Sequence, residues 1–166
     1  MTYPNYELVT RSYPVFFLIM LAALCAQSQN NKALNEAEKY YGIKGYEQAL
    51  PNYLQAIEAG EKSAIVHYKT GICYTKSPEV ATQIKAIPYF EYAVKNGDGI
   101  PASVHFDLGE LYLKDENIKG AIESFTKYKQ VVNKADKKAQ SDADRALERC
   151  NNALVFMSVP RNTKVT

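Results

Sequence analysis

A short helical phrase recurs in the same phase along the chain, and this repeat constrains the fold more than any other feature. Its copies are ALPNYLQA at residues 49–56, AIPYFEYA at 86–93 and AIESFTKY at 121–128. Upstream of each copy lies a small residue and, three positions later, a tyrosine: Ala37 and Tyr40, Gly71 and Tyr74, Gly109 and Tyr112. Residues at this spacing share one helix face, so a small residue lets a second helix approach closely. The repeat therefore predicts a series of helical hairpins.

The pattern resembles the tetratricopeptide repeat, whose period is about 34 residues and whose two helices carry small and aromatic residues at these places. The step from Ala37 to Gly71 is one such period, whereas the step from Gly71 to Gly109 is longer. The longer step contains Ser77 and Pro78, which suit an N-cap and a first helical position and predict an added helical turn. The resemblance implies an all-α fold: a tetratricopeptide-type α-solenoid of three helical hairpins plus a C-terminal capping helix.

The expected helical repeat domain covers residues 29–157. We predict its repeats at about 30–63, 64–101 and 102–135, and a capping helix at about 133–157. The capping helix has apolar residues at three- and four-residue steps, namely Ala139, Ala143, Ala146, Leu147, Cys150, Leu154 and Met157. Asn133 and Asp136 suit its first turn. Such a helix would cover the apolar face that the last hairpin of a solenoid exposes.

The N-terminal part of the chain contains its most apolar run, at residues 13–26, with Arg11 just before it. A span of hydrocarbon needs about 20 apolar residues, and this run is shorter. We therefore predict a secretory signal peptide over residues 1–28, cleaved after Ala26 or Ser28. An uncleaved membrane anchor is one alternative. Acylation of Cys25 in a lipoprotein is another, although Leu24 is bulkier than the small residue that usually precedes such a cysteine.

A narrower resemblance involves the order of these segments. The signal, the prolines in the first two phrases, the Cys-Asn-Asn-Ala segment at 150–153 and the proline before a β-like tail are similar to the N-terminal region of OmpA-like envelope proteins of Bacteroidetes-type bacteria. The resemblance implies a periplasmic location, in association with the outer membrane. In that family the repeats precede a β-propeller and a peptidoglycan-binding domain. We interpret residues 158–166 as a linker or the start of a missing domain, and the chain as a fragment or a shortened relative.

Charge and chemistry exclude several classes of function. The formal net charge is +2, and this balance offers no electrostatic footprint for nucleic acid, whose binding needs a clustered basic face. His67 and His105 occupy the same repeat position, where a large side chain is expected to pack within its hairpin. We expect Cys73 and Cys150 to be core thiols rather than a disulfide. The sequence predicts no enzyme activity, cofactor or metal, with metal binding or catalysis through the two histidines as the competing reading.

The remaining candidate function is protein binding on the wall formed by the first helix of each repeat. The predicted peptide-binding groove consists of Leu34, Glu38, Tyr41, Ile65, Tyr68, Ile72, Lys76, Phe106, Glu110, Leu113 and Lys114. Leu34, Tyr68 and Phe106 share one repeat position and form an apolar row. The alternative is that these three side chains only pack between neighbouring repeats. We expect a protein or peptide partner in the cell envelope, either for an OmpA-like protein or for a free-standing periplasmic adaptor or assembly factor.

A known carboxylate clamp of some tetratricopeptide domains provides a comparison for this groove. In those domains a clamp of lysine, asparagine and arginine side chains holds the carboxylate. Four of the equivalent positions in this sequence hold Leu34, Glu38, Ser103 and Asp107, and only Lys69, at a further clamp position, is basic. The C-terminal carboxylate of a chaperone would meet acidic side chains there, so that particular partner is not expected.

Overall fold

The structure is a computed structural model that describes residues 31–158, together with Leu18 and Met20. Every regular element within residues 31–158 is helical, and no strand occurs among them, which confirms the predicted all-α class. The predicted signal peptide, apart from Leu18 and Met20, lies outside the described residues. The tail at 159–166 also lies outside them. No helix within the described residues is long and apolar enough to cross a membrane.

The chain divides into two compact units, Met1–Lys62 and Ser63–Thr166. In the first unit, a helix over residues 31–42 is followed by α2 (Tyr46–Glu58). Five side chains of this unit are fully buried or nearly so: Ala33, Ala37, Ala49, Tyr53 and Ala56. The Tyr53 hydroxyl donates a hydrogen bond to Glu38 Oε1 at 2.9 Å. This hydrogen bond satisfies a polar group that would otherwise be buried at a cost.

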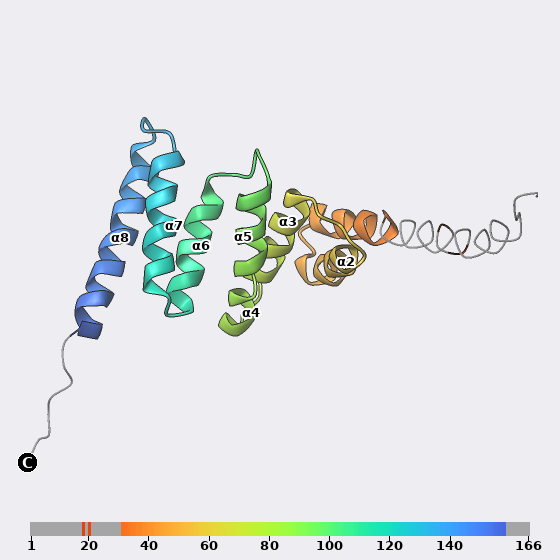
Figure 1. Cartoon of the computed structure of the whole chain (residues 1–166), viewed down its shortest axis with the longest axis horizontal. Helices are drawn as coiled ribbons and strands as arrows, with labels where there is room; N and C mark the ends of the chain where they lie inside the picture. The colour runs from red at the N-terminus through yellow and green to blue at the C-terminus, as the bar shows by residue number, and fades with distance from the viewer. Residues whose placement is uncertain (1–17, 19, 21–30, 159–166) are drawn as a thin grey trace, which may run out of the picture. The chain divides into compact units, whose positions relative to one another are not determined.

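The second unit contains six helices among its described residues. They are α3 (Ala64–Thr75), α4 (Val80–Ile84), α5 (Ile87–Asn96), α6 (Ser103–Lys114), α7 (Ile118–Val131) and α8 (Lys137–Ser158). Helix α3 packs on α5, α5 on α6, α6 on α7, and α7 on α8. Figure 1 shows α5, α6, α7 and α8 side by side. The short α4 contacts α3 and α6.

In each of the two hairpins of this unit, a glycine on the first helix lies against a buried phenylalanine ring on the second. Gly71 of α3 faces Phe90 of α5, and Gly109 of α6 faces Phe125 of α7. A Cβ atom added to Gly109 would lie 2.5 Å from the Phe125 ring, and one added to Gly71 would overlap the Phe90 ring in the same way. Both rings are fully buried. The two hairpins thus repeat the same close contact at the positions that share a phase in the sequence.

The inserted helical turn forms, but it begins later than predicted. Helix α4 starts at Val80 after Glu79, not at Pro78. Ser77 makes its hydrogen bond before the helix begins: its Oγ accepts from the Glu79 N–H at 3.3 Å. The serine therefore organises the turn before the helix rather than capping the helix itself.

The last helix also starts later than predicted. Helix α8 begins at Lys137, and Asp136 Oδ1 accepts a hydrogen bond from the Ala139 N–H at 3.0 Å, which makes Asp136 its N-cap. Asn133 belongs to the preceding turn, where its Oδ1 accepts from the Ala135 N–H at 2.9 Å. The prediction of a helix from residue 133 is therefore wrong by one turn.

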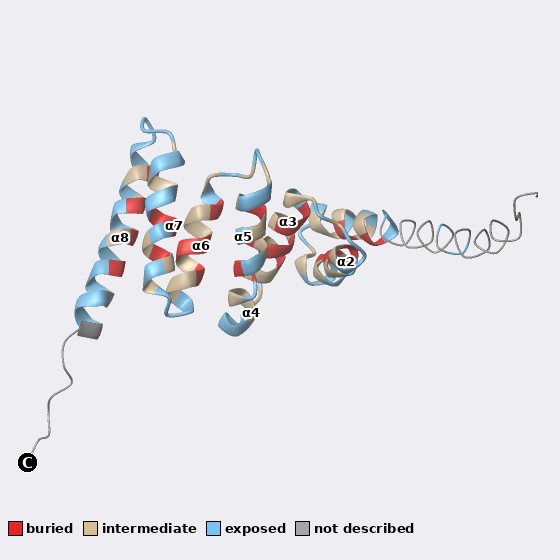
Figure 2. Cartoon of the chain, in the orientation of Figure 1, coloured by how far each residue is buried: buried red, intermediate tan, exposed pale blue. Residues whose placement is uncertain are grey.

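Helix α8 covers the hairpin of α6 and α7 through a stripe of small residues. Ala139, Ala143, Ala146 and Cys150 are buried, as the three- and four-residue spacing predicted. Figure 2 shows the buried residues of α6, α7 and α8 where these helices face one another. Leu154 is 44% exposed, so this member of the predicted apolar stripe lies at the surface rather than in the core. The Met157 side chain is outside the described part of the chain.

Candidate functional site

The predicted groove residues of the first unit take part in contacts within their own hairpin. Leu34 and Glu38 are half-buried, and Glu38 accepts the hydrogen bond from Tyr53. The Tyr41 ring lies edge-on to Tyr46, with centroids 5.6 Å apart, and to Tyr53, at 6.1 Å. Glu38 and Tyr41 therefore help to hold the hairpin together.

The predicted groove residues of the second unit fall into a packed set and an exposed set. Ile72 packs against the core cluster around Phe90, and Leu113 against the cluster around Phe125. The exposed members are Ile65 and Lys76 on or next to α3 and Lys114 on α6. Lys114 Nζ donates a hydrogen bond to Gln83 Oε1 at 2.5 Å, which ties α6 to α4.

Tyr68 and Phe106 of the predicted apolar row are half-buried, and each lies against aromatic side chains of the second helix in its own hairpin. The Tyr68 and Phe90 centroids are 5.9 Å apart. The Phe106 ring lies edge-on to Phe125 and to Tyr128, with centroids 5.2 Å away in each case. These distances are typical of stabilising aromatic pairs. Both rings thus pack within the unit, and only part of each can contact a partner.

The facing sides of α3 and α6 bring several polar groups close to Tyr68. Burial raises the pKa of the Tyr68 hydroxyl, and the Asp107 carboxylate raises it further, whereas a hydrogen bond with Ser103 lowers it. Burial also raises the pKa of the Asp107 carboxyl; the Lys76 charge lowers it and the Glu110 charge raises it. Asp107, which was not part of the predicted groove, therefore lies among its residues as a half-buried acid.

A surface hollow of about 600 Å³ lies along α6 and α8. We call it the α6–α8 hollow. It is lined by Phe106, Glu110, Asp142, Arg145, Ala146, Glu148, Arg149 and Asn152. Only Phe106 and Glu110 of this set belong to the predicted groove. All of the others come from α8.

Ion pairs organise the charged side chains of this hollow. The Arg149 guanidinium pairs with Glu110, which links α8 to α6, and Arg145 pairs with Asp142 within α8. Lys138 Nζ also lies 2.8 Å from Asp142 Oδ2. Hydrogen bonds from Lys138 and then Arg145 lower the pKa of the Asp142 carboxyl. Glu110 and Asp142 therefore have cationic partners, and Glu148 is a third, exposed acid of the lining. The two arginines retain further donors, since a guanidinium has five.

The α8 side of the hollow was missed because the sequence reasoning gave α8 only a capping role. Its polar residues nevertheless carry a spacing signal: Asp142, Arg145, Arg149 and Asn152 follow one another at three- and four-residue steps. Such steps place side chains on one helix face. The buried alanines determine how α8 is rotated about its axis. That rotation turns the polar face of α8 toward α6.

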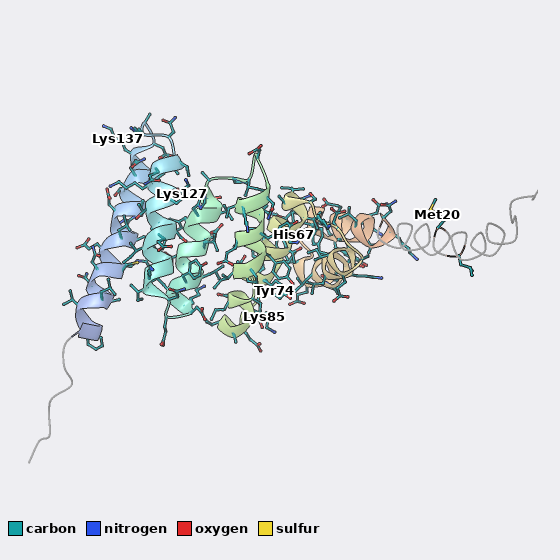
Figure 3. The ribbon with its side chains drawn as sticks, in the orientation of Figure 1. Met20, His67, Tyr74, Lys85, Lys127 and Lys137 are labelled. Carbon is teal, nitrogen blue, oxygen red and sulfur yellow. The ribbon has the colours of Figure 1, made fainter. Side chains whose placement is uncertain are left out.

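The paired histidines occupy packing positions in their hairpins. His67 is buried; its ring stacks on Tyr92 with centroids 3.8 Å apart, and its Nδ1 lies 3.0 Å from the Ser63 carbonyl oxygen. Figure 3 shows His67 between α3 and α5. His105 is half-buried, and burial together with the Lys127 charge lowers its pKa. Within the described residues, no three His, Cys, Asp or Glu side chains converge as a metal site.

Cys73 and Cys150 are buried thiols on helices α3 and α8. Leu111, which holds the repeat position of Cys73, is buried as well. Both cysteines thus occupy core positions, as expected from their places on the apolar stripes. Burial raises the pKa of the Cys150 thiol, which disfavours the reactive thiolate.

Comparison with known proteins adds no assignment to this geometry. No protein-family model matches the chain, and no curated protein matches it.

Proposed function

We propose that the chain is a non-catalytic, tetratricopeptide-like α-solenoid that binds a protein partner in the bacterial cell envelope, as the N-terminal region of an OmpA-like protein. Its location would be periplasmic and outer-membrane associated. A free-standing periplasmic adaptor or assembly factor would use the same surface. The sequence segments that motivate the location are the apolar run at 13–26 and the arrangement of the repeats.

The observation that carries the proposal is the repeated glycine–phenylalanine contact. Gly71 with Phe90 and Gly109 with Phe125 place two successive hairpins in equivalent packing. Equivalent hairpins that bury their apolar faces against neighbours are the building principle of solenoids, and solenoids present a continuous wall of first helices. In the second unit that wall would comprise α3 and α6, followed by the capping helix α8.

The side chains on this wall are suited to binding rather than to chemistry. Aromatic rings are partly exposed at Tyr68 and Phe106, with separated charges at Lys76, Glu110 and Lys114. Partly buried rings supply contact area at low entropic cost, and charges around them fix the orientation of a partner. This combination supports a peptide-binding surface.

The experiment is site-specific photocrosslinking of the full chain in its native cell. A photoreactive residue replaces Ile65, Lys76 or Lys114, whose side chains are exposed. We expect each of these positions to crosslink to the same envelope protein, since all three belong to the proposed wall.

Matched positions on the second helices of the hairpins provide the control. Lys95 on α5 and Lys119 on α7 are exposed and outside the predicted groove. They should give no crosslink to that protein. Crosslinks from the control positions alone, or none from the wall, would contradict the proposed surface.

A further inference from the structure

A second surface hollow, of about 480 Å³, lies where α7 ends and α8 begins. We call it the α7–α8 hollow. It is lined by Thr126, Lys129, Gln130, Lys134 and Gln140. This lining contains two lysines and no acid, whereas the lining of the α6–α8 hollow contains three acids. Its other side chains are a hydroxyl and two amides, which can donate hydrogen bonds. Such a set of groups suits an anion that offers only acceptors.

The charges around the α7–α8 hollow are unbalanced in favour of lysine. Residues 126–140, which include the whole lining, contain five lysines and a single aspartate. Two acids from the next turn of α8 reach into this region, because Asp144 pairs with Lys129 and Asp142 with Lys138. Positive charge exceeds negative charge even when both of these acids are counted. Three exposed lysines of the stretch have no acid partner among the described residues: Lys127, Lys134 and Lys137.

The lysines surround the end of the α7–α8 pair rather than following one groove. Lys127 and Lys129 are two positions apart on α7, a spacing that directs their side chains to different sides of the helix. Figure 3 shows Lys137 at this end of the second unit and Lys85 at the opposite end. Val131, which is 45% exposed, adds an apolar side chain at the last turn of α7. A broad anionic surface can contact side chains that point in several directions, whereas an extended peptide follows a single groove.

We propose that the α7–α8 end of the second unit docks on an anionic phospholipid surface, with a headgroup phosphate in the α7–α8 hollow against Lys129 and Lys134. The neighbouring lysines add electrostatic attraction to the surface, and Val131 contacts the headgroup region. Asp136 and the two ion-paired aspartates reduce this attraction without reversing it. The inference goes beyond the proposed protein binding and does not depend on it, because it uses the turn between α7 and α8 rather than the wall.

The test measures contact between this end of the full chain and lipid vesicles. A fluorescent amino acid replaces Gln130 in the lining, and the vesicles carry a quencher on some of their headgroups. One set of vesicles is phosphatidylcholine alone, and the other also contains the anionic lipid phosphatidylglycerol. We expect at least about fivefold stronger quenching by the anionic vesicles, since each lysine near an anionic surface strengthens binding by about fivefold. The apolar run at 13–26 is present in every sample, so any vesicle binding of its own is common to all of them.

Lys134→Gln with Lys137→Gln should weaken the contact with anionic vesicles by about tenfold or more, because two unpaired charges are lost. Lys134→Arg with Lys137→Arg should retain the contact. The matched control, Lys85→Gln with Lys119→Gln, removes the same net charge away from the hollow. It should leave the contact within about twofold, since exposed charges at a distance are screened.

Circular dichroism verifies that every variant keeps its helices. Equal quenching by the two kinds of vesicle overturns the inference, and so does unchanged quenching in the variant with glutamine at positions 134 and 137. If that occurs while Ile65, Lys76 and Lys114 still crosslink to one envelope protein, the proposed function stands and only the lipid contact is wrong.

Discussion

At the scale of single residues, two glycines of the second unit allow a buried phenylalanine ring to lie close to the neighbouring helix. Gly71 and Gly109 present no side chain to Phe90 and Phe125, so the rings lie directly on the backbone of the partner helix. Glycine lowers the intrinsic stability of a helix interior relative to alanine by roughly 0.5–1 kcal/mol. The close approach of the buried rings offsets this cost.

Gly109→Ala should therefore destabilise the protein, although alanine is the better helix former. The added Cβ would lie 2.5 Å from the Phe125 ring and force the α6–α7 hairpin apart. Overpacking of this kind lowers the free energy of unfolding by about 1–3 kcal/mol. Urea denaturation followed by circular dichroism measures the change.

Gly42→Ala is the matched control. A Cβ atom at Gly42 would have no neighbour within 4 Å. Its free energy of unfolding should stay constant or rise by about 0.4–1 kcal/mol, since alanine restricts the unfolded chain. If Gly109→Ala behaves like this control, the glycine–phenylalanine contact does not hold the hairpin.

At the scale of elements, helix starts are determined by individual hydrogen bonds. Asn133 and Asp136 both suit an N-cap by residue type, yet only Asp136 accepts from a helical N–H. The Asp136 carboxylate also lies at the positive end of the α8 dipole. The start of α8 thus follows from one side chain.

Asp136→Ala should shorten or destabilise α8, because it leaves the Ala139 N–H without its acceptor. Loss of an N-cap costs about 0.5–2 kcal/mol in the free energy of unfolding. Thermal unfolding of the full chain, together with hydrogen exchange of the first turn of α8, measures the effect. Asn133→Ala, which removes the equivalent bond in the preceding turn, should have a clearly smaller effect; equal effects would argue against Asp136 as the cap.

The elements also show what the sequence could and could not predict. The phase of the repeat predicted that Gly71 and Gly109 hold the same place in their copies and let a second helix approach closely. That Phe90 and Phe125 are the rings that lie against them is known only from the structure. It did not determine where α4 and α8 begin, since several capping residues compete within a few positions. The alanine stripe predicted which face of α8 is buried, but not that the neighbouring polar residues lie beside α6, because that depends on how the helices pack together.

At the scale of the whole molecule, each compact unit is organised by paired helices with small residues at their contacts. In the second unit, α5 and α7 are the second helices of two equivalent hairpins, and α8 packs on α7. Helix α8 has 22 residues and α7 has 14, and Phe156 is exposed where α8 extends furthest. The proposed wall of α3, α6 and α8 accounts for both the partly exposed rings and this extension.

Hydrogen exchange of the full chain, with and without the envelope protein identified by crosslinking, tests the proposed wall most directly. The account predicts slower exchange in α3, α6 and α8 when the partner is bound, because these helices would contact it, and unchanged exchange in α5 and α7. Slower exchange confined to α5 and α7, or no change in any helix, would contradict it.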